Sequence, residues 1–410
     1  MHSNCSQVGV KKMKRKVNDI NRRIVIFALR NIGNFGEELL CDTTRFLLRK
    51  VNPRIEINVA QFSPGTKDLY GIGFWRVIVG AFVERVSRVL PILRTYLLDL
   101  RFQVRDAAYC RVAISDADCV VTAYGMLKYS TQCAASGFYR LAKESARQGK
   151  PFFISAVSPQ RPDVSDWRCR QLMRAINCQS VKMITTRDGK SGVDRIRSGY
   201  VTDNASCRIL KVGDPALWAA DCYGIHRREH SSTIGIGMVR SGVFEDYGGG
   251  VSAKELEIVY LQLIDDLERN HVDWRLFTNG MPDDIEFAKR LLSKKNYPQE
   301  KLLPRANDAA EFVRQIAGFK VVFGGRLHAN IVSASLGIPF VGMRWDDKFA
   351  GFFASTGRSF FLLEPNELEE GAIYRRIKLA CNSSVDMATI ENLKMKTLHS
   401  FRMFSDEFII

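Results

Sequence analysis

The amino-acid sequence predicts an α/β protein made of two Rossmann-like domains that face each other across a cleft. The chain has 410 residues, too many for one compact core, so about two domains of roughly 200 residues each are expected. Hydrophobic residues make up 46% and charged residues 25%, an ordinary globular composition that excludes a disordered, collagenous or coiled-coil chain. Short apolar runs alternate with longer amphipathic segments in both halves, which is typical of parallel sheets covered by helices on both faces.

The first half of the chain holds six apolar runs of strand length, and several of them are separated by segments of helical period. The expected strands cover residues 24–29, 55–62, 119–123, 152–157, 182–186 and 208–212. The expected helices cover residues 37–49, 131–148, 168–177 and 189–198. Strand, helix and strand repeated in this way predict a first α/β domain over residues 23–222.

The second half repeats the pattern after a polar stretch at residues 223–232, which is typical of a linker. The expected strands cover residues 233–239, 274–278, 321–323, 339–343 and 360–363. The expected helices cover residues 253–269, 283–294, 308–317, 329–336 and 367–379. We therefore expect a second α/β domain over residues 233–410 and a flexible basic tail over residues 1–22.

The charge and cysteine content limit the possible partners. Lysine and arginine number 60 against 44 aspartate and glutamate, and the net charge of +16 favours an anionic partner. We expect no nucleic acid, because the basic residues are scattered and no recognition helix, zinc finger or aromatic RNA-binding motif is present. Ten cysteines without a Cys-x-x-Cys pair or a Cys/His cluster indicate free thiols in a reducing compartment and no metal site.

Residues 74–105 form the most lipid-like segment. Glu84, Arg85, Arg88 and Arg94 interrupt its apolar run, so no window approaches the roughly 20 apolar residues that span a bilayer. Two interpretations stay open: an arginine-rich amphipathic helix at a membrane surface, or a pair of core helices divided at Pro91. We expect a cytoplasmic protein, with this segment as the candidate for peripheral contact at the inner face of the membrane.

The first motif follows the first expected strand. Gly33 and Gly36, three residues apart, allow a tight turn and a close approach of the backbone to a ligand. Asn34 offers both a donor and an acceptor, which sugar hydroxyls require. Glu37 lies in the first turn of the expected helix, where the helix dipole favours an acidic residue, so it could equally serve the helix alone.

The most informative motif follows the expected strand at residues 321–323. Gly324 and Gly325 at a strand-to-helix turn, with the backbone N–H groups of the helix start, predict an anion site. Arg326 adds a planar fork that matches a carboxylate or phosphate. His328 can carry a proton near neutral pH. The alternative is a capping or packing histidine beside a surface arginine, and the preceding Gly-Gly-Arg at a strand end favours function.

Ligands of such sheets bind beyond the carboxyl ends of the strands. Other polar groups at such positions are Arg240, Arg187, Asp188, Asp214 and Lys348. Arg240 has the best claim among them, since a cation at a strand end in a cleft suits a polyanionic ligand. Turn and capping roles are the alternatives for the others.

Taken together, these motifs resemble the polysaccharide pyruvyl transferases. The resemblance runs from about residue 24 to residue 363, in the family's order. The matching motifs are Gly33-Asn34-Phe35-Gly36-Glu37-Glu38, Arg187-Asp188-Gly189-Lys190-Ser191, Asp214-Pro215-Ala216, Gly325-Arg326-Leu327-His328-Ala329 and Gly337-Ile338-Pro339 with Asp347-Lys348. Glu37 replaces the family's usual aspartate, and Tyr124-Gly125 stands where the family has a glycine pair.

The resemblance implies a glycosyltransferase-B-like fold and transfer of pyruvate from phosphoenolpyruvate to a sugar, commonly as a ketal, with release of phosphate. The acceptor would be a surface polysaccharide or its lipid-linked precursor. On this basis His328 is the expected general acid at the methylene carbon and Glu37 the base for a sugar hydroxyl.

The remaining site residues are assigned on the same basis. Arg326 and Arg240 would hold the donor's carboxylate and phosphate. The backbone at Gly325 and Leu327 would help, as would Lys348. The acceptor-binding residues would be Asn34, Gly33 and Gly36. The scheme needs neither a metal nor a further cofactor, because arginines can neutralise the leaving phosphate. A nucleotide-sugar glycosyltransferase on the same two-domain plan is the alternative.

Overall fold

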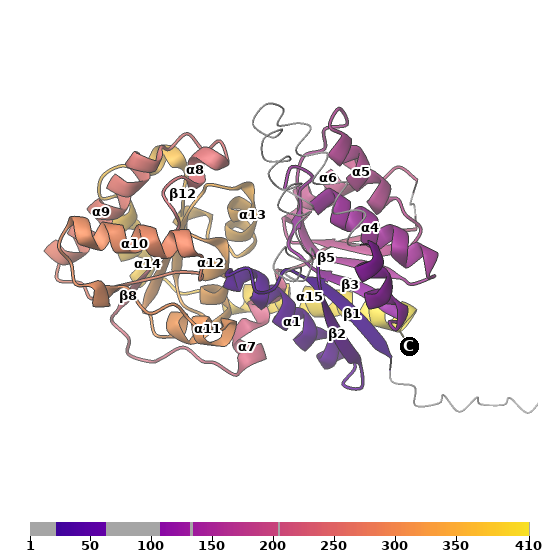
Figure 1. Cartoon of the computed structure of the whole chain (residues 1–410). Coiled ribbons are helices and arrows are strands. Elements are labelled where there is room, and N and C mark those ends of the chain that lie inside the picture. The colour runs from indigo at the N-terminus through magenta and orange to yellow at the C-terminus, as the bar shows by residue number, and fades with distance from the viewer. Residues whose placement is uncertain (1–21, 63–106, 132–133, 204–205, 410) are drawn as a thin grey trace, which may run out of the picture.

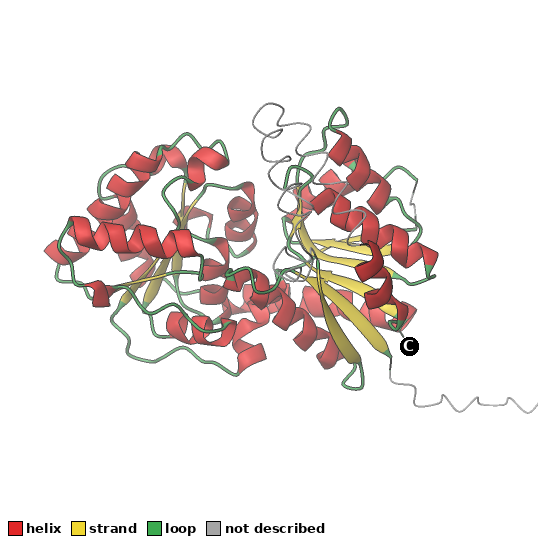
Figure 2. Ribbon diagram, viewed as in Figure 1, coloured by secondary structure: helices red, strands yellow, loops and turns green. Residues whose placement is uncertain are grey.

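The structure is a computed structural model that describes residues 22–62, 107–131, 134–203 and 206–409. It consists of two domains, each built on one parallel sheet with helices packed on its faces (Figures 1 and 2). The predicted α/β class and two-domain organisation are confirmed. The segment at residues 74–105 and all but the last residue of the predicted tail lie outside the described residues. Among the described helices, none is long and apolar enough to cross a membrane.

The sheet of the first domain has the strand order β2-β1-β3-β5-β6-β7, with the short β4 beside β5, over the described residues. Its strands are β1 (Arg23–Ala28), β2 (Glu56–Gln61), β3 (Cys119–Ala123), β4 (Met126–Leu127), β5 (Phe152–Pro159), β6 (Val181–Thr186) and β7 (Arg208–Lys211). All neighbouring pairs are parallel. Strands β3 and β5 are buried at every position, because helices cover both faces of this sheet.

The helices of the first half begin with α1, whose apolar residues recur at helical spacing and pack toward the sheet. These helices include α1 (Phe35–Val51), α4 (Ala134–Arg147), α5 (Trp167–Ile176), α6 (Gly189–Gly199), the 3-10 turn η2 (Pro215–Trp218) and α7 (Ala219–Tyr223), and residues 107–115 are helical as well. The expected helices of this half are all present, with ends that differ by a few residues.

The sheet of the second domain has the order β12-β11-β10-β8-β9, again parallel throughout the described residues. Its strands are β8 (Ile234–Gly237), β9 (Trp274–Phe277), β10 (Val321–Gly324), β11 (Phe340–Met343) and β12 (Leu362–Leu363). Its helices are α8 (Val243–Asp246), α9 (Ala253–Arg269), α10 (Pro282–Lys294), α11 (Ala309–Ala317), α12 (Leu327–Ser335), α13 (Asp347–Ser355) and α14 (Ala372–Cys381). The expected strand at 360–363 is shortened because Ser359–Phe361 forms a 3-10 turn.

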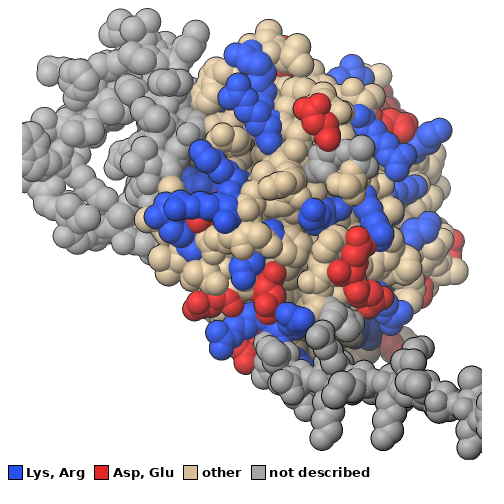
Figure 3. All heavy atoms as spheres, turned by 90° about the vertical axis from the view of Figure 1, so that its right-hand side faces the viewer, with Lys and Arg blue, Asp and Glu red and all other residues tan. Residues whose placement is uncertain are grey.

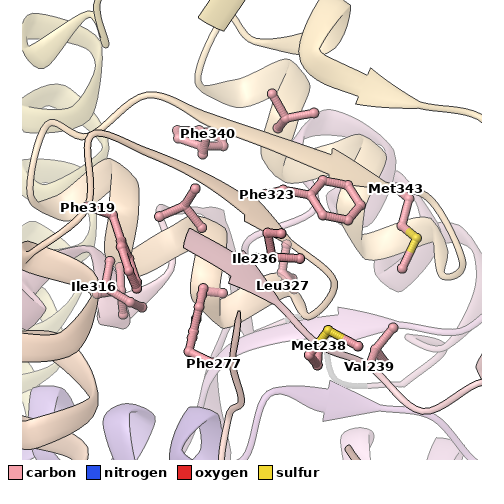
Figure 4. Close-up of a cluster of buried hydrophobic side chains, with 14 of the residues drawn as sticks. Ile236, Met238, Val239, Phe277, Ile316, Phe319, Phe323, Leu327, Phe340 and Met343 are labelled. Atoms are coloured by element: carbon pink, nitrogen blue, oxygen red, sulfur yellow. The ribbon is translucent and has the colours of Figure 1, made fainter. Parts of the chain in front are cut away.

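The core of the second domain forms where the strands meet the helices that cover them. Figure 4 shows Phe277 and Phe319 among these side chains, and their ring centroids are 5.3 Å apart. Gly235 on β8 admits this packing, since a Cβ there would lie 2.4 Å from the Phe319 ring. Dense apolar packing of this kind fixes the carboxyl ends of β8 and β10, from which the motif residues project.

The last helix, α15 (Met387–Phe408), crosses back to the first domain (Figure 1). Phe401 and Phe404 pack against Phe153 of β5, with ring centroids 5.2 and 5.1 Å apart. Thr397 donates a hydrogen bond to the Gly213 carbonyl at 2.9 Å. Ile390 and Leu393, near the start of α15, belong to the core of the second domain, so the helix packs against both domains. The helix pattern of the sequence gives its length and apolar stripe, and it does not say which sheet receives that stripe.

Positive and negative side chains are interspersed on the face of the molecule that Figure 3 shows. On the face that Figure 3 turns toward the viewer, lysine and arginine lie in several separate groups with aspartate and glutamate between them. This mixed pattern differs from the continuous basic stripe that tracks a nucleic-acid backbone.

Candidate functional site

The loop after β1 carries the first motif and reaches into the second domain. Gly33 turns the chain at a φ of +81°, which glycine adopts without strain. Asn34 caps α1, and its Oδ1 accepts a hydrogen bond from the Gly36 N–H at 3.0 Å. Phe35 packs in the core of the second domain, where its ring stacks on Phe312 at 5.8 Å. The N-terminal end of α1 is therefore anchored between the two domains.

Gly36 and His328 bring the two main motifs into contact. A Cβ on Gly36 would lie 2.2 Å from Nδ1 of His328 and 2.7 Å from its Cγ. The imidazole thus occupies the space that any other side chain at position 36 would need. The structure joins two residues that the sequence assigns to different domains, 292 positions apart.

Arg187 and Asp214 form a buried ion pair whose charges act on His328. Arg187 directly follows β6, Asp214 lies just beyond β7, and their side chains are 7% and 2% exposed. Arg187 also donates to the Gly125 carbonyl and to Oγ of Ser158, both at 3.1 Å. Asp214 accepts a hydrogen bond from the Ala216 N–H at 2.8 Å. Fixed from both sides, the pair supplies a rigid polar wall.

Glu37 is buried with one carboxylate oxygen, Oε2, that has no hydrogen-bond partner among the described residues. Burial raises the pKa of Glu37 to about 7, while the charges of Arg187 and Lys348 act in the opposite direction. Near neutral pH this carboxyl group therefore exists in both protonation states, a condition that suits proton transfer.

His328 lies at the start of α12, and its Nε2 is buried without a partner among the described residues. Burial lowers the pKa of His328 to about 3, although the charge of Asp214 favours the protonated form. The imidazole is neutral at pH 7 in this structure, whereas the expected role of general acid uses the imidazolium. A neutral ring can instead hydrogen-bond a ligand through Nε2.

Lys348 and Lys128 approach Asp346 from opposite domains. Nζ of Lys128 lies 2.7 Å from Oδ2 of Asp346, and Nζ of Lys348 lies 3.5 Å from the same oxygen. Burial disfavours the charge on Asp346, but the two ammonium groups lower its pKa. Burial also lowers the pKa of Lys348 to about 8, so it stays mostly charged at pH 7. This group closes one end of the interface between the domains.

A cavity of about 610 Å³ opens between the domains. The first domain contributes Lys128, Ser158, Pro159, Gln160, Arg161, Asp188 and Arg195, and the second contributes Tyr247, Gly248, Gly249, Arg344, Trp345, Asp346, Asp347, Lys348, Glu364 and Pro365. Lys348 also lines a small void with Arg187, Asp214 and Leu327. Of the predicted site residues within the described chain, Lys348 alone lines the large cavity. Lys348 also belongs to a buried group that we call the polar cluster, which consists of Glu37, Arg187, Asp214, His328 and Lys348.

Arg326 and Arg240, the expected donor-binding arginines, are paired with carboxylates. Nη2 of Arg326 donates to Oδ1 of Asp284 at 2.8 Å, and its Nε donates to the other oxygen. Asp284 is fully buried and also accepts a hydrogen bond from the Arg240 N–H at 2.9 Å. The Arg240 guanidinium pairs with Asp246. An incoming anion would have to compete with these carboxylates for either guanidinium.

Gly325 and Leu327 shape the turn between β10 and α12. A Cβ on Gly325 would lie 2.6 Å from both the Gly237 carbonyl oxygen and the Tyr260 hydroxyl, so the turn accepts only glycine. Leu327 is buried and lines the small void beside Lys348. The shape of the turn between β10 and α12 is therefore set by close packing of its backbone.

Sequence reasoning noted Arg187 and Asp214 at strand ends without including them among the site residues. Both residues follow strands that are neighbours in the sheet, β6 and β7, and this position after successive strands could have indicated that their side chains lie close together. Lys128, Tyr247 and Trp345 gave no sequence signal. Lys128 and Asp346 are 218 positions apart, and only the packing of the two domains brings them together.

The described residues contain no group of three or more His, Cys, Asp or Glu side chains placed to hold a metal ion.

Comparisons with known structures identify the fold. The UDP-GlcNAc 2-epimerase from Methanocaldococcus jannaschii is 11% identical, with a TM-score of 0.56 over 94% of this chain and all of the other. Trehalose-6-phosphate synthase OtsA is also 11% identical, with a TM-score of 0.56 over 95% of this chain and 99% of the other. No curated protein matches the sequence. Two parallel-sheet domains around a polar cleft therefore define a glycosyltransferase-B-like fold.

Within that fold class the family is also defined. The family model described as polysaccharide pyruvyl transferase matches residues 34–347, which include most of both domains, the Gly-Gly-Arg-Leu-His motif and all of the first motif except Gly33. The chain belongs to the polysaccharide pyruvyl transferase family, as its motifs indicated. Membership implies a transferase of polysaccharide biosynthesis with a sugar acceptor.

Proposed function

We propose that this protein transfers the pyruvyl group of phosphoenolpyruvate to hydroxyls of a sugar, as a ketal, and releases phosphate. The acceptor would be a surface polysaccharide or its lipid-linked precursor, and the reaction would take place in the cytoplasm. The observation that supports the proposal is the polar cluster: Gly36, next to Glu37 in the first domain, packs on His328 of the second domain, and the charge of Lys348 acts on Glu37.

Phosphoenolpyruvate carries a carboxylate and a phosphate, so its site needs cations and hydrogen-bond donors. Lys348 supplies a charged ammonium that faces both the cavity and the small void. Arg187 lines the same void, where it is paired with Asp214, and Nε2 of His328 is buried without a hydrogen-bond partner among the described residues. We assign Arg326 and Arg240 to holding the strand ends around this site, through Asp284.

Glu37 is our candidate for proton transfer. Its protonated form delivers a proton to the methylene carbon, which makes C2 electrophilic, and a sugar hydroxyl attacks C2. The resulting carboxylate accepts the proton of that hydroxyl. Phosphate then leaves with the electron pair of the C2–O bond, and a second hydroxyl attacks C2 while its proton passes to phosphate. One hydroxyl proton is thus balanced by the new methyl group and the other by hydrogen phosphate, so no outside acid is consumed.

The test combines phosphoenolpyruvate with p-nitrophenyl pyranosides and follows phosphate release and the ketal methyl signal by NMR. Glu37→Gln should abolish both signals. Lys348→Ala should raise the KM for phosphoenolpyruvate at least tenfold, whereas Lys254→Ala, at an exposed lysine of α9, should leave it unchanged. Transfer of sugar from a UDP-sugar, with no use of phosphoenolpyruvate, would contradict the proposal and favour a glycosyltransferase.

A further inference from the structure

The cavity between the domains is lined on one side by a partly exposed aromatic side chain, Tyr247. This side chain is 47% exposed and lines the cavity. Its ring forms a T-shaped pair with the ring of Trp345, with centroids 4.9 Å apart and an angle of 66° between the planes. Trp345 is itself held by a hydrogen bond from Nε1 to the Gly325 carbonyl at 2.7 Å. Through Trp345, the partly exposed ring of Tyr247 is thus held next to Gly325, in the turn between β10 and α12.

The backbone beside Tyr247 leaves room for a ligand. Gly248 and Gly249 follow it and line the same cavity. A Cβ on Gly249 would lie 2.7 Å from the Phe244 ring, so this position requires glycine. The wall is therefore one aromatic ring next to bare backbone, whose N–H and C=O groups can meet hydroxyls.

The opposite wall is polar. Ser158, Gln160 and Arg161 of the first domain line it, and Lys128 reaches over the Tyr247 ring, with its Nζ 5.4 Å from the ring centroid. A ligand in this cavity would meet an aromatic surface on one side and hydrogen-bonding groups on the other. A pyranose ring has these same properties, with apolar C–H faces and polar edges.

Phosphoenolpyruvate is a poor match for the face of the Tyr247 ring itself. The face of an aromatic ring carries negative charge density and does not favour the anionic groups of phosphoenolpyruvate. The residues that the sequence assigned to the acceptor are also occupied elsewhere: Asn34 caps α1, and Gly36 packs on His328. Neither they nor Gly33 is among the described residues that line the cavity.

We propose that Tyr247, supported by Trp345 and flanked by Gly248 and Gly249, is the platform on which the pyranose ring of the acceptor stacks. The inference rests on the proposed function and names a positioning residue for the acceptor. Stacking would direct the ring's hydroxyls toward Lys348 and the polar cluster, because Lys348 lines both spaces.

The experiment is saturation-transfer difference NMR with three probes: methyl β-D-glucopyranoside, its 4-epimer, and sorbitol. Both pyranosides have rigid C–H faces, and sorbitol offers hydroxyls without one. With the wild-type protein, at least one pyranoside should show transfer concentrated on the ring protons of one face, and sorbitol should show none. Tyr247→Ala should reduce the transfer at least fivefold, and Tyr247→Phe should keep it. Phe360→Ala, a change at an aromatic ring 59% exposed that does not line the cavity, is the matched control and should keep it too.

The proposal is overturned if neither pyranoside binds, if Tyr247→Ala binds as well as wild type, or if sorbitol shows the same Tyr247-dependent transfer. Titration of phosphoenolpyruvate into the same proteins separates this outcome from failure of the proposed function. Donor binding that is unaffected by Tyr247→Ala, together with unchanged sugar binding, would refute the platform alone. Tyr247-dependent sugar binding without any donor binding would support the platform and refute the donor assignment.

Discussion

The contact between Gly36 and His328 gives the sharpest prediction, through the substitution Gly36→Ala. The new Cβ would lie 2.2 Å from Nδ1 of His328, whereas non-bonded heavy atoms are comfortable at about 3.5 Å. The overlap is therefore about 1 Å, and either α1 or the imidazole must move. Because Phe35 anchors this end of α1 in the second domain, we expect the imidazole to move.

The magnitude follows from two opposing effects. Overpacking of a well-packed site costs about 1–3 kcal/mol of folding free energy. Alanine is favoured over glycine within a helix by about 0.5–1 kcal/mol, which offsets part of that cost. A net loss of about 1–2 kcal/mol is therefore expected, with a fall in kcat/KM of about 100-fold if the catalytic geometry shifts by 1 Å.

The assay is a double-mutant cycle on the free energy of unfolding in denaturant. In the His328→Ala background the clash is absent, so Gly36→Ala should become neutral or stabilising, with a coupling of about 1–3 kcal/mol. Gly351→Ala is the matched control: this glycine lies within α13, also at the domain interface, and its Cβ would make ordinary contacts of 3.4 Å or more. An equal cost of Gly36→Ala with and without His328 would refute the reasoning.

Three further predictions concern buried groups. Burial raises the pKa of Glu37 to about 7 from 4.5, so the stability that the wild type has below pH 4.5 is lost as the pH rises through 7. At pH 8 the Glu37→Gln variant should therefore be more stable than the wild type by up to about 3 kcal/mol. Denaturation from pH 4 to 8 measures this difference, and a difference that does not change with pH would contradict the pKa shift. Arg187→Leu should lower the free energy of unfolding by about 3–5 kcal/mol, because it leaves Asp214 buried without its partner. The double variant Arg187→Leu/Asp214→Leu should lose less stability than the sum of the two single variants, and strict additivity would count against the ion pair. Phe35→Ala should cost about 3–5 kcal/mol and also lower kcat, since its ring fixes the position of Glu37; loss of stability with unchanged kcat would separate the anchor from the site.

The sequence was sufficient for the two sheets and for the motif positions. The apolar runs became strands because parallel sheets bury both faces. Arg187 directly follows β6, and His328 lies in the first turn of the helix that follows β10. Pattern alone could not assign α15, because an amphipathic stripe does not identify the sheet that it covers.

The arrangement of charges was harder to predict. The sequence predicted that Arg326 and Arg240 hold the anionic groups of the donor, and in the structure Asp284 and Asp246 pair with them. The neutral state of His328 depends on burial, which is a property of the packed domains. Sequence position located these residues, and three-dimensional packing determined their charge states and partners.

The measurement that tests the central claim most directly is calorimetric titration of the wild-type protein with phosphoenolpyruvate and, separately, with UDP-N-acetylglucosamine. We expect phosphoenolpyruvate to bind, at least tenfold more weakly to Lys348→Ala than to wild type, and we expect no binding of the UDP-sugar. Tight binding of the UDP-sugar with none of phosphoenolpyruvate would contradict the account and assign the cleft to sugar transfer.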